Sequence, residues 1–265
     1  MYNEALRLED LHLSYRGLVG TSISKPRPLG FFESGIQPGE QELISGANLV
    51  VQKGETICIG GGSGQGKSAL LRVISGLARP NAGKMYIFGE YIPPERLTAL
   101  NIAKRQVGLV FQNGALISNL RVRDNIALPL RYHKVGTATE IEDKVRMAMD
   151  LMRVRDYADF FPHMLSVGMQ KRVAIGPQLL LMDEPTAGLD NYNRRNLLPL
   201  IDNMRTLFKT TIIIVTHDLM VAKELNCKIT FLTHKQLTEP RYFDEWLHSD
   251  TAISKELFRD LRTSG

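Results

Sequence analysis

Hydrophobic residues along the chain alternate between short apolar runs and longer stretches of helical periodicity. The apolar runs lie at residues 55–59, 107–111, 179–182, 211–215 and 229–232. Several are almost continuously apolar, as strands buried on both faces of a parallel sheet are. Near the start, leucines at nearly alternate positions in residues 6–15 predict a half-buried strand. Strands that alternate with helices predict an α/β fold with a mostly parallel sheet.

Four segments between or after these runs have helical periodicity. They lie at about residues 70–77, after Thr137, at 191–208 and at 250–262. The second begins with a Thr-x-x-Glu pattern, which predicts a capping box between Thr137 and Glu140. Residues 17–44 are instead rich in Gly, Pro and Ser, and we expect a loop insert or an irregular hairpin there.

The composition is that of a globular protein and does not identify a binding partner. The chain has 265 residues, 43% hydrophobic and 23% charged, as expected for a globular protein of one large or two small domains. The net charge of +5 is a mild excess and does not itself indicate nucleic acid. The two cysteines, Cys58 and Cys227, are too few for a disulfide framework, and we expect reduced thiols with Cys58 in the core. No signal peptide or membrane-spanning run is expected.

The sequence GGSGQGKS at residues 61–68 follows a predicted strand and opens a predicted helix, which is the setting of a phosphate-binding loop. Glycines let successive backbone N–H groups surround phosphate oxygens, and the helix N-terminus adds its positive dipole end. We expect Lys67 to reach the β and γ phosphates and Ser68 to ligate Mg²⁺. The predicted nucleotide-binding residues of this loop are Gly61, Gly62, Ser63, Gly64, Gln65, Gly66, Lys67, Ser68 and Ala69.

The segment LLLMDE at residues 179–184 supplies the acidic half of such a site. A predicted buried strand ends in Asp183, which we expect to hold Mg²⁺, with Glu184 next as the catalytic base or the group that positions water. Mg²⁺ keeps several waters and takes few carboxylates, which suits one Asp and one Ser. The two motifs together predict an NTPase.

Further motifs occur in a recognisable order. LSVGMQKR at 165–172 resembles the LSGGQ signature of ABC-type ATPases; Gln112 and His217 each end a predicted strand, Asp190 follows the DEPT tetrapeptide, and Tyr15 ends the first strand. Over nearly its whole length the chain resembles the ATP-binding subunit of an ABC transporter. The resemblance implies a single ABC ATPase domain over 1–265, with an N-terminal antiparallel β region. Its catalytic core would be 1–111 and 177–240, its helical subdomain 112–176 and its C-terminal helical extension 241–265.

The resemblance also implies roles for single residues. Tyr15 would stack on adenine, and Gln112 would sense Mg²⁺ and the attacking water. His217 would contact the γ-phosphate and hold Glu184. The signature residues Ser166 and Gly168 would contact the γ-phosphate from the opposite subunit, and Asp190 is a further nucleotide-binding candidate. This arrangement implies a homodimer with two ATP molecules at its interface.

Residues 112–133 resemble the corresponding segment of the Mla/Mce lipid-transport ATPases. That resemblance implies phospholipid movement between inner and outer membranes, a permease dimer contacted through 112–133, and an MCE-domain lipid-binding partner. The chain would lie at the cytoplasmic face of the inner membrane. The alternative is another ABC importer or a lipoprotein-release system.

Two other functions can be weighed from the sequence: a nucleic-acid ATPase and a catalytically weak regulatory subunit. A nucleic-acid ATPase would need a long coiled coil or a second ATPase domain, and residues 68–165 hold no sustained heptads, so no nucleic-acid partner is expected. Val167 stands where the signature usually has glycine, and the stretch around residues 172–178 is shorter than the family's pattern. A catalytically weak regulatory subunit is the reading that these two departures favour.

Overall fold

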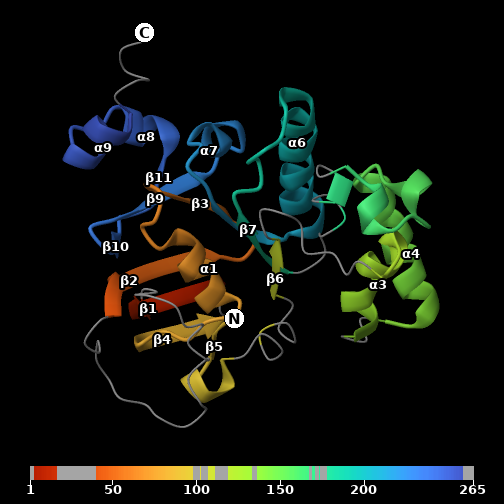
Figure 1. Ribbon diagram of the computed structural model, residues 1–265, viewed down its shortest axis with the longest axis horizontal. Coiled ribbons are helices and arrows are strands. Elements are labelled where there is room, and N and C mark those ends of the chain that lie inside the picture. The colour runs from red at the N-terminus through yellow and green to blue at the C-terminus, as the bar shows by residue number, and fades with distance from the viewer. Residues whose placement is uncertain are drawn as a thin grey trace.

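The computed structural model describes residues 3–16, 40–97, 102, 107–110, 119–132, 136–166, 169–170, 173 and 178–258. Two sheets and a separate group of helices make up this part of the chain (Figure 1). Both the mostly parallel sheet and the N-terminal antiparallel region are present, so the predicted fold class is confirmed.

The larger sheet has the strand order β10-β9-β3-β8-β7-β6, with β11 also paired to β9. Its central strands β9, β3, β8, β7 and β6 run parallel, and the chain returns in antiparallel β10 and β11 at one side. Their bounds are β3 Thr56–Gly60, β6 Val107–Val110, β7 Leu179–Asp183, β8 Thr211–Val215, β9 Lys228–Thr233, β10 Gln236–Leu237 and β11 Arg241–Tyr242. All five apolar runs identified in the sequence therefore form the parallel strands.

The smaller sheet is antiparallel, with the order β2-β1-β4-β5. It contains β1 Glu4–Arg16, β2 Glu40–Gln52, β4 Ala82–Ile87 and β5 Glu90–Tyr91. Of the two structures predicted for 17–44, the loop is wrong at the end of the segment and the hairpin fits there, because residues 40–44 form the start of β2 and pair antiparallel with β1. Their mixed polar composition hid a strand whose partner is distant in sequence. Residues 17–39 lie outside the described part.

Helix α1, Lys67–Ile74, packs between the two sheets. The parallel strands alternate their side chains between two cores. Ile57, Ile59, Leu181 and Ile213 face α1 and the antiparallel sheet, whereas Cys58 faces the opposite core with α6, as predicted for a small buried residue. Because both faces are covered, the strands have no polar alternation, and this explains their continuous apolar runs.

The remaining helices cover the second face or form the helical group at the right of Figure 1. The capping box predicted at Thr137 is confirmed, and Glu140 accepts a hydrogen bond from the Thr137 backbone N–H at 2.7 Å, which lowers the pKa of that carboxyl. The bounds are α3 Val122–Tyr132, α4 Ala138–Leu151, α6 Asn191–Phe208, α7 Met220–Glu224, α8 Phe243–Leu247 and α9 Ala252–Leu257, with short 3₁₀ turns at Pro94–Arg96, Arg155–Tyr157 and Pro162–Met164.

The C-terminal segment 241–265, predicted as a helical extension, begins with a short strand. Residues Arg241–Tyr242 form β11, which pairs with β9 before α8 begins. Trp246 then anchors α8: its indole N–H donates to the Ile229 carbonyl at 2.9 Å, and its ring meets Phe231 edge to face. None of the helices in the described ranges is long and apolar enough to cross a membrane.

We expect Trp246→Ala to lower the free energy of unfolding by about 3–5 kcal/mol, because it empties a buried aromatic site and removes the hydrogen bond to the Ile229 carbonyl. Urea denaturation followed by circular dichroism measures this. Tyr192→Ala is the matched control, since that ring is 76% exposed and its loss is expected to cost under about 1 kcal/mol. Equal losses for the two variants would contradict the anchoring role of Trp246.

Candidate nucleotide-binding site

The phosphate loop lies between β3 and α1, as predicted, at the carboxyl end of the parallel sheet. Gly61 has φ +138°, and a Cβ there would lie 2.6 Å from the Leu232 carbonyl oxygen. Gly66, with φ +99°, begins α1 in a left-handed conformation. Glycine adopts these turns without strain, and at Gly61 it also lets the backbone pass close to the Leu232 carbonyl and the Gln65 side chain. The loop therefore has the shape that a phosphate cradle requires.

Lys67 places its ammonium group against this loop. Its Nζ donates to the carbonyl oxygens of Gly61 at 2.8 Å and Gly62 at 2.7 Å. Burial lowers the pKa of Lys67, while the carboxylates of Glu184 and Asp183 act in the opposite direction. A cation is thus held at the loop with two carboxylates nearby, as binding of a triphosphate with its metal requires.

Ser68, in the first turn of α1, lies beside Asp183 at the end of β7, and the sequence predicts both as magnesium ligands. The Ser68 hydroxyl donates to Asp183 Oδ1 at 2.9 Å. A hydroxyl and a single carboxylate are hard oxygen ligands, and Mg²⁺ commonly takes its other ligands from water and phosphate. Over the described residues, no group of three or more His, Cys, Asp or Glu side chains could hold a metal. The pair therefore fits Mg²⁺ bound together with a nucleotide.

Glu184 is held by the loop that follows β8. Its Oε1 lies 2.9 Å from His217 Nδ1 and accepts the His217 backbone N–H at 3.0 Å, while its Oε2 accepts the Thr216 hydroxyl at 3.1 Å. The backbone of Glu184 has φ +47° and donates to Val215 O at 2.8 Å. The predicted pair of Glu184 and His217 is thus brought together, with the exposed imidazole ring outermost.

Asp190, a nucleotide-binding candidate, and Ser166, expected to face a second subunit, are both described. Asp190 is exposed and caps α6, accepting the Asn193 backbone N–H at 2.7 Å. Ser166 is also exposed, and its hydroxyl accepts the Met169 N–H at 3.3 Å. Gln112, Val167, Gly168 and residues 174–177 lie outside the described residues, as does the side chain of Tyr15. The Tyr15 backbone pairs with Gln41 one residue before the end of β1.

Sequence reasoning missed two contributors to this site. Thr216 was read only as part of the strand end before His217, although a hydroxyl directly before that histidine was a visible signal. Gln65 was assigned to the loop without a role, and its Oε1 accepts the Gly62 backbone N–H at 2.7 Å.

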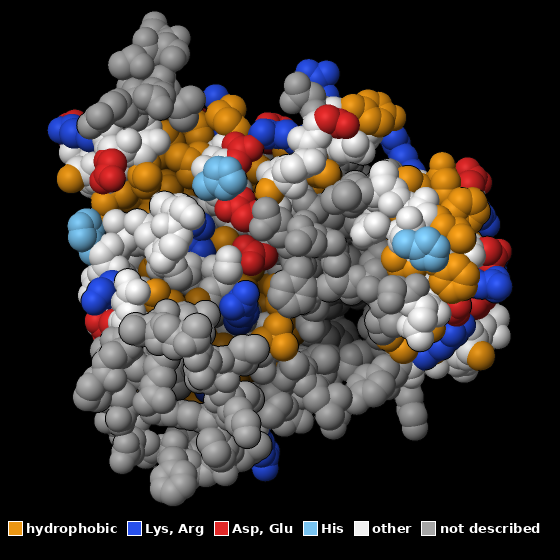
Figure 2. All heavy atoms as spheres, viewed as in Figure 1, with side chains coloured by type: hydrophobic (Ala, Val, Ile, Leu, Met, Phe, Trp, Pro, Cys, Tyr) orange, Lys and Arg blue, Asp and Glu red, His pale blue; other side chains and the backbone are white. Residues whose placement is uncertain are grey.

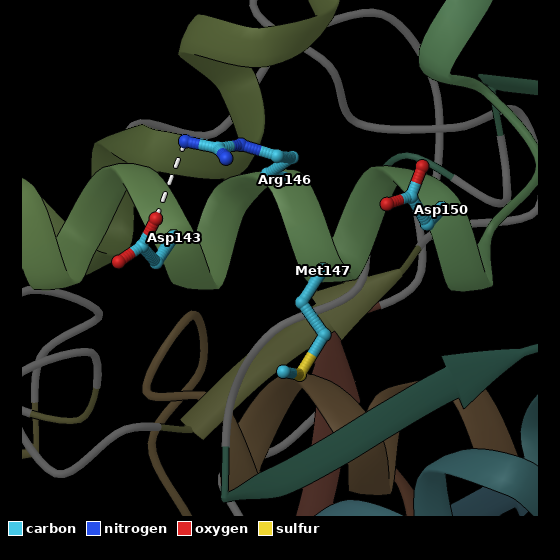
Figure 3. A pocket seen from close by; sticks show the side chains of 4 residues that line it. All are labelled: Asp143, Arg146, Met147 and Asp150. Carbon is cyan, nitrogen blue, oxygen red and sulfur yellow. Dashed lines mark ion pairs between the residues drawn. The ribbon is translucent and has the colours of Figure 1, made fainter.

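A pocket also opens on α4, lined by Asp143, Arg146, Met147 and Asp150 (Figure 3). Arg146 pairs with Asp143 at 3.2 Å on this helix. None of the lining residues comes from the phosphate loop, so this pocket is separate from the nucleotide site.

Residues 44–187 match the family model described as ABC transporter. The chain is 32% identical over 240 residues to a methionine import ATP-binding protein, MetN, of Campylobacter jejuni, covering 82% of this chain and 71% of that one. It is 32% identical to a probable sulfate/thiosulfate import ATP-binding protein, CysA, of Chlorella vulgaris, covering 76% and 85%. The chain spans 56% of the length of the Brucella abortus MetN relative.

Among solved structures, an ATP-binding cassette described as a dimer in a post-hydrolysis state bound to ADP and Pi superimposes with a TM-score of 0.70. It is 25% identical, with 89% of this chain and 98% of that chain covered. The family match spans more than half of the sequence and includes both the phosphate loop and the acidic strand end. The chain belongs to the ABC transporter family, and it is an ABC-type ATPase.

Proposed function

We propose that this chain is the ATP-hydrolysing subunit of an ABC importer for a small solute. The observation that supports it most is the convergence of the phosphate loop, the Ser68–Asp183 pair and the Glu184–His217 pair at one edge of the sheet. The names of the relatives support import as the direction of transport, since they describe import of methionine and of sulfate or thiosulfate.

In this proposal the loop residues bind the phosphates through backbone N–H groups and the Lys67 ammonium, and Ser68 and Asp183 hold Mg²⁺. The bound metal supplies charge stabilisation to the triphosphate. Glu184 orients the attacking water and accepts its proton. His217 keeps the Glu184 carboxylate in place and contacts the γ-phosphate. The short distances from Glu184 to Thr216 and His217 support these roles.

A second copy of the chain would complete each site. Ser166 and Asp190 are exposed and bind no phosphate-loop residue of their own chain by any described hydrogen bond, so their surfaces are available to a partner. The structural relative is described as a dimer, which supports the pairing of two copies. The homodimer would hold two ATP molecules between its subunits.

Hydrophobic side chains gather on the helical group that contains α3 and α4 (Figure 2). The exposed large hydrophobic residues there are Leu128, Met147, Tyr157, Phe160 and Met164, each between 37% and 58% exposed. An apolar surface of this kind suits an amphipathic helix of a membrane partner. We therefore assign the permease contact to this surface, which would hold the ATPase at the cytoplasmic face of the membrane.

The expectation of phospholipid transport with an MCE-domain partner rests on the resemblance of residues 112–133 alone. The reported relatives are named as importers of small solutes and do not support it. Residues 111–118 and 133–135, which carry much of that resemblance, lie outside the described part. The importer is therefore the reading we favour.

The test is affinity purification of the tagged chain from membranes, followed by mass spectrometry and reconstitution into liposomes. We expect a multi-span permease to co-purify, and ATP-dependent uptake of labelled methionine or sulfate into the liposomes. Leu128→Asp, on the proposed contact surface, is expected to lose the permease while an exposed apolar residue elsewhere, Leu77→Asp, keeps it. Recovery of an MCE-domain protein, with phospholipid transfer instead of solute uptake, would contradict the importer.

A further inference from the structure

Arg194, the fourth residue of α6, joins three separate segments through one side chain. Its Nη1 donates to Asp218 Oδ2 at 2.6 Å, and its Nη2 donates to Glu224 Oε1 at 2.7 Å. Asp218 directly follows His217, and Glu224 ends α7. The planar guanidinium can bond two carboxylates at once in a fixed direction, which a lysine ammonium cannot do with the same geometry.

The bonds of Asp218 lead on to the proposed catalytic residues. Its backbone N–H donates to the Thr216 hydroxyl oxygen at 3.0 Å, and that hydroxyl donates to Glu184 Oε2 at 3.1 Å. Asp218 Oδ1 also accepts the Met220 N–H at 3.0 Å, which fixes the start of α7. A continuous set of hydrogen bonds therefore runs from Arg194 to the carboxylate of Glu184.

The other end of this connection is the turn that begins α6. The Arg194 backbone N–H donates to the Asp190 carbonyl at 3.0 Å, within the first helical turn. Asp190 is exposed and belongs to the surface assigned above to the second subunit. A shift of this turn would move the Arg194 backbone and, through its side chain, the loop of residues 216–218.

We propose that Arg194 is a positioning residue for ATP hydrolysis: it holds the 216–218 loop against α6, so that Glu184 and His217 keep their mutual contact, and it links that contact to the Asp190 turn. This inference rests on the proposed role of Glu184 in hydrolysis. It is independent of which solute the complex transports.

If the Arg194–Asp218 ion pair only stabilised the fold, its loss would lower the free energy of unfolding and leave the rate of ATP hydrolysis unchanged. The side chains of Arg194 and Asp218 are each 25% exposed, and partly exposed pairs contribute little to folding stability. The rate of hydrolysis is more sensitive, because a displacement of about 1 Å in a catalytic group can cost a factor of ~100. Loss of Arg194 is therefore expected to reduce turnover far more than it reduces stability or nucleotide affinity.

The experiment measures kcat and KM for ATP in the purified chain with Arg194→Met. We expect kcat to fall about tenfold while KM stays within about twofold, and Arg194→Lys to recover only part of the rate. Arg205→Met is the matched control, because Arg205 lies on the same helix and pairs at 2.6 Å with Asp202 of that helix. It is expected to retain the wild-type rate.

The variant Asp218→Asn tests the path itself. If Arg194 acts through Asp218, the double variant Arg194→Met/Asp218→Asn is expected to be no slower than the slower single variant. Wild-type kcat in Arg194→Met, or a tenfold loss in Arg205→Met as well, would overturn the inference while leaving ATP hydrolysis intact. A wild-type chain that does not hydrolyse ATP would overturn the hydrolytic role of Glu184 and this inference together.

Discussion

Glu184→Gln is expected to lower kcat for ATP by a factor of about 100–1,000 while ATP still binds. The amide keeps the size of the carboxylate and still accepts a hydrogen bond at its oxygen, but it cannot take a proton from water. It also cannot accept at both oxygens, as Glu184 does from Thr216 and His217. Steady-state hydrolysis and equilibrium binding of ATP, measured on the same preparation, separate the two effects.

Because hydrolysis would be needed to open the dimer, this variant is also expected to accumulate as an ATP-bound dimer. Sedimentation with ATP and Mg²⁺ detects that species. Glu239→Gln is the matched control, since Glu239 is 79% exposed and lies on the loop before β11. Wild-type turnover in Glu184→Gln would remove Glu184 from its proposed role.

Lys67→Ala is expected to weaken ATP binding about 10- to 100-fold, because it removes a charge-assisted contact to the phosphates. The Gly62 carbonyl that it leaves belongs to the exposed residues 62–65, so water can replace the ammonium group there. Gly61 is buried, and the loss of its bond is expected to cost about 1–3 kcal/mol of folding stability. Calorimetric titration with ATP and Mg²⁺ measures the affinity.

Lys255→Ala serves as the control, because that ammonium is 59% exposed on α9 and pairs only with Asp250 among its described ion pairs. Thermal unfolding of Lys67→Ala verifies that a loss of affinity does not arise from loss of the fold. Unchanged affinity for ATP in Lys67→Ala would show that the Lys67 ammonium group does not bind the phosphates.

The sequence predicted those helices and strands whose residues carry a local signal, such as a continuous apolar run or a capping pattern. The continuous apolar run 211–215 became a strand buried on both faces, and the Thr137–Glu140 spacing became a capping box, because burial and capping leave a direct signature in residue type. The glycines of 61–66 likewise indicated a loop with positive φ. The start of β2 at Glu40 was missed, since its pairing with β1 is set by residues far away in the chain.

The same limit applies within the candidate site. Lys67, Ser68, Asp183 and Glu184 belong to motifs whose spacing is recognisable, and the structure brings them together. The support that Arg194 gives to this site was not predicted, because its partners come from a loop 24 residues further along the chain. Only the folded arrangement of α6 beside the end of β8 makes that contact visible.

The most direct test of the account is the structure of Glu184→Gln solved with ATP and Mg²⁺. We expect two copies facing each other, with the γ-phosphate within hydrogen-bond distance of Lys67 in one copy and of Ser166 in the other. Mg²⁺ is expected between Ser68, Asp183 and the phosphates. A nucleotide bound away from residues 61–68, or held by one copy with Ser166 of the second copy remote from it, would contradict the account.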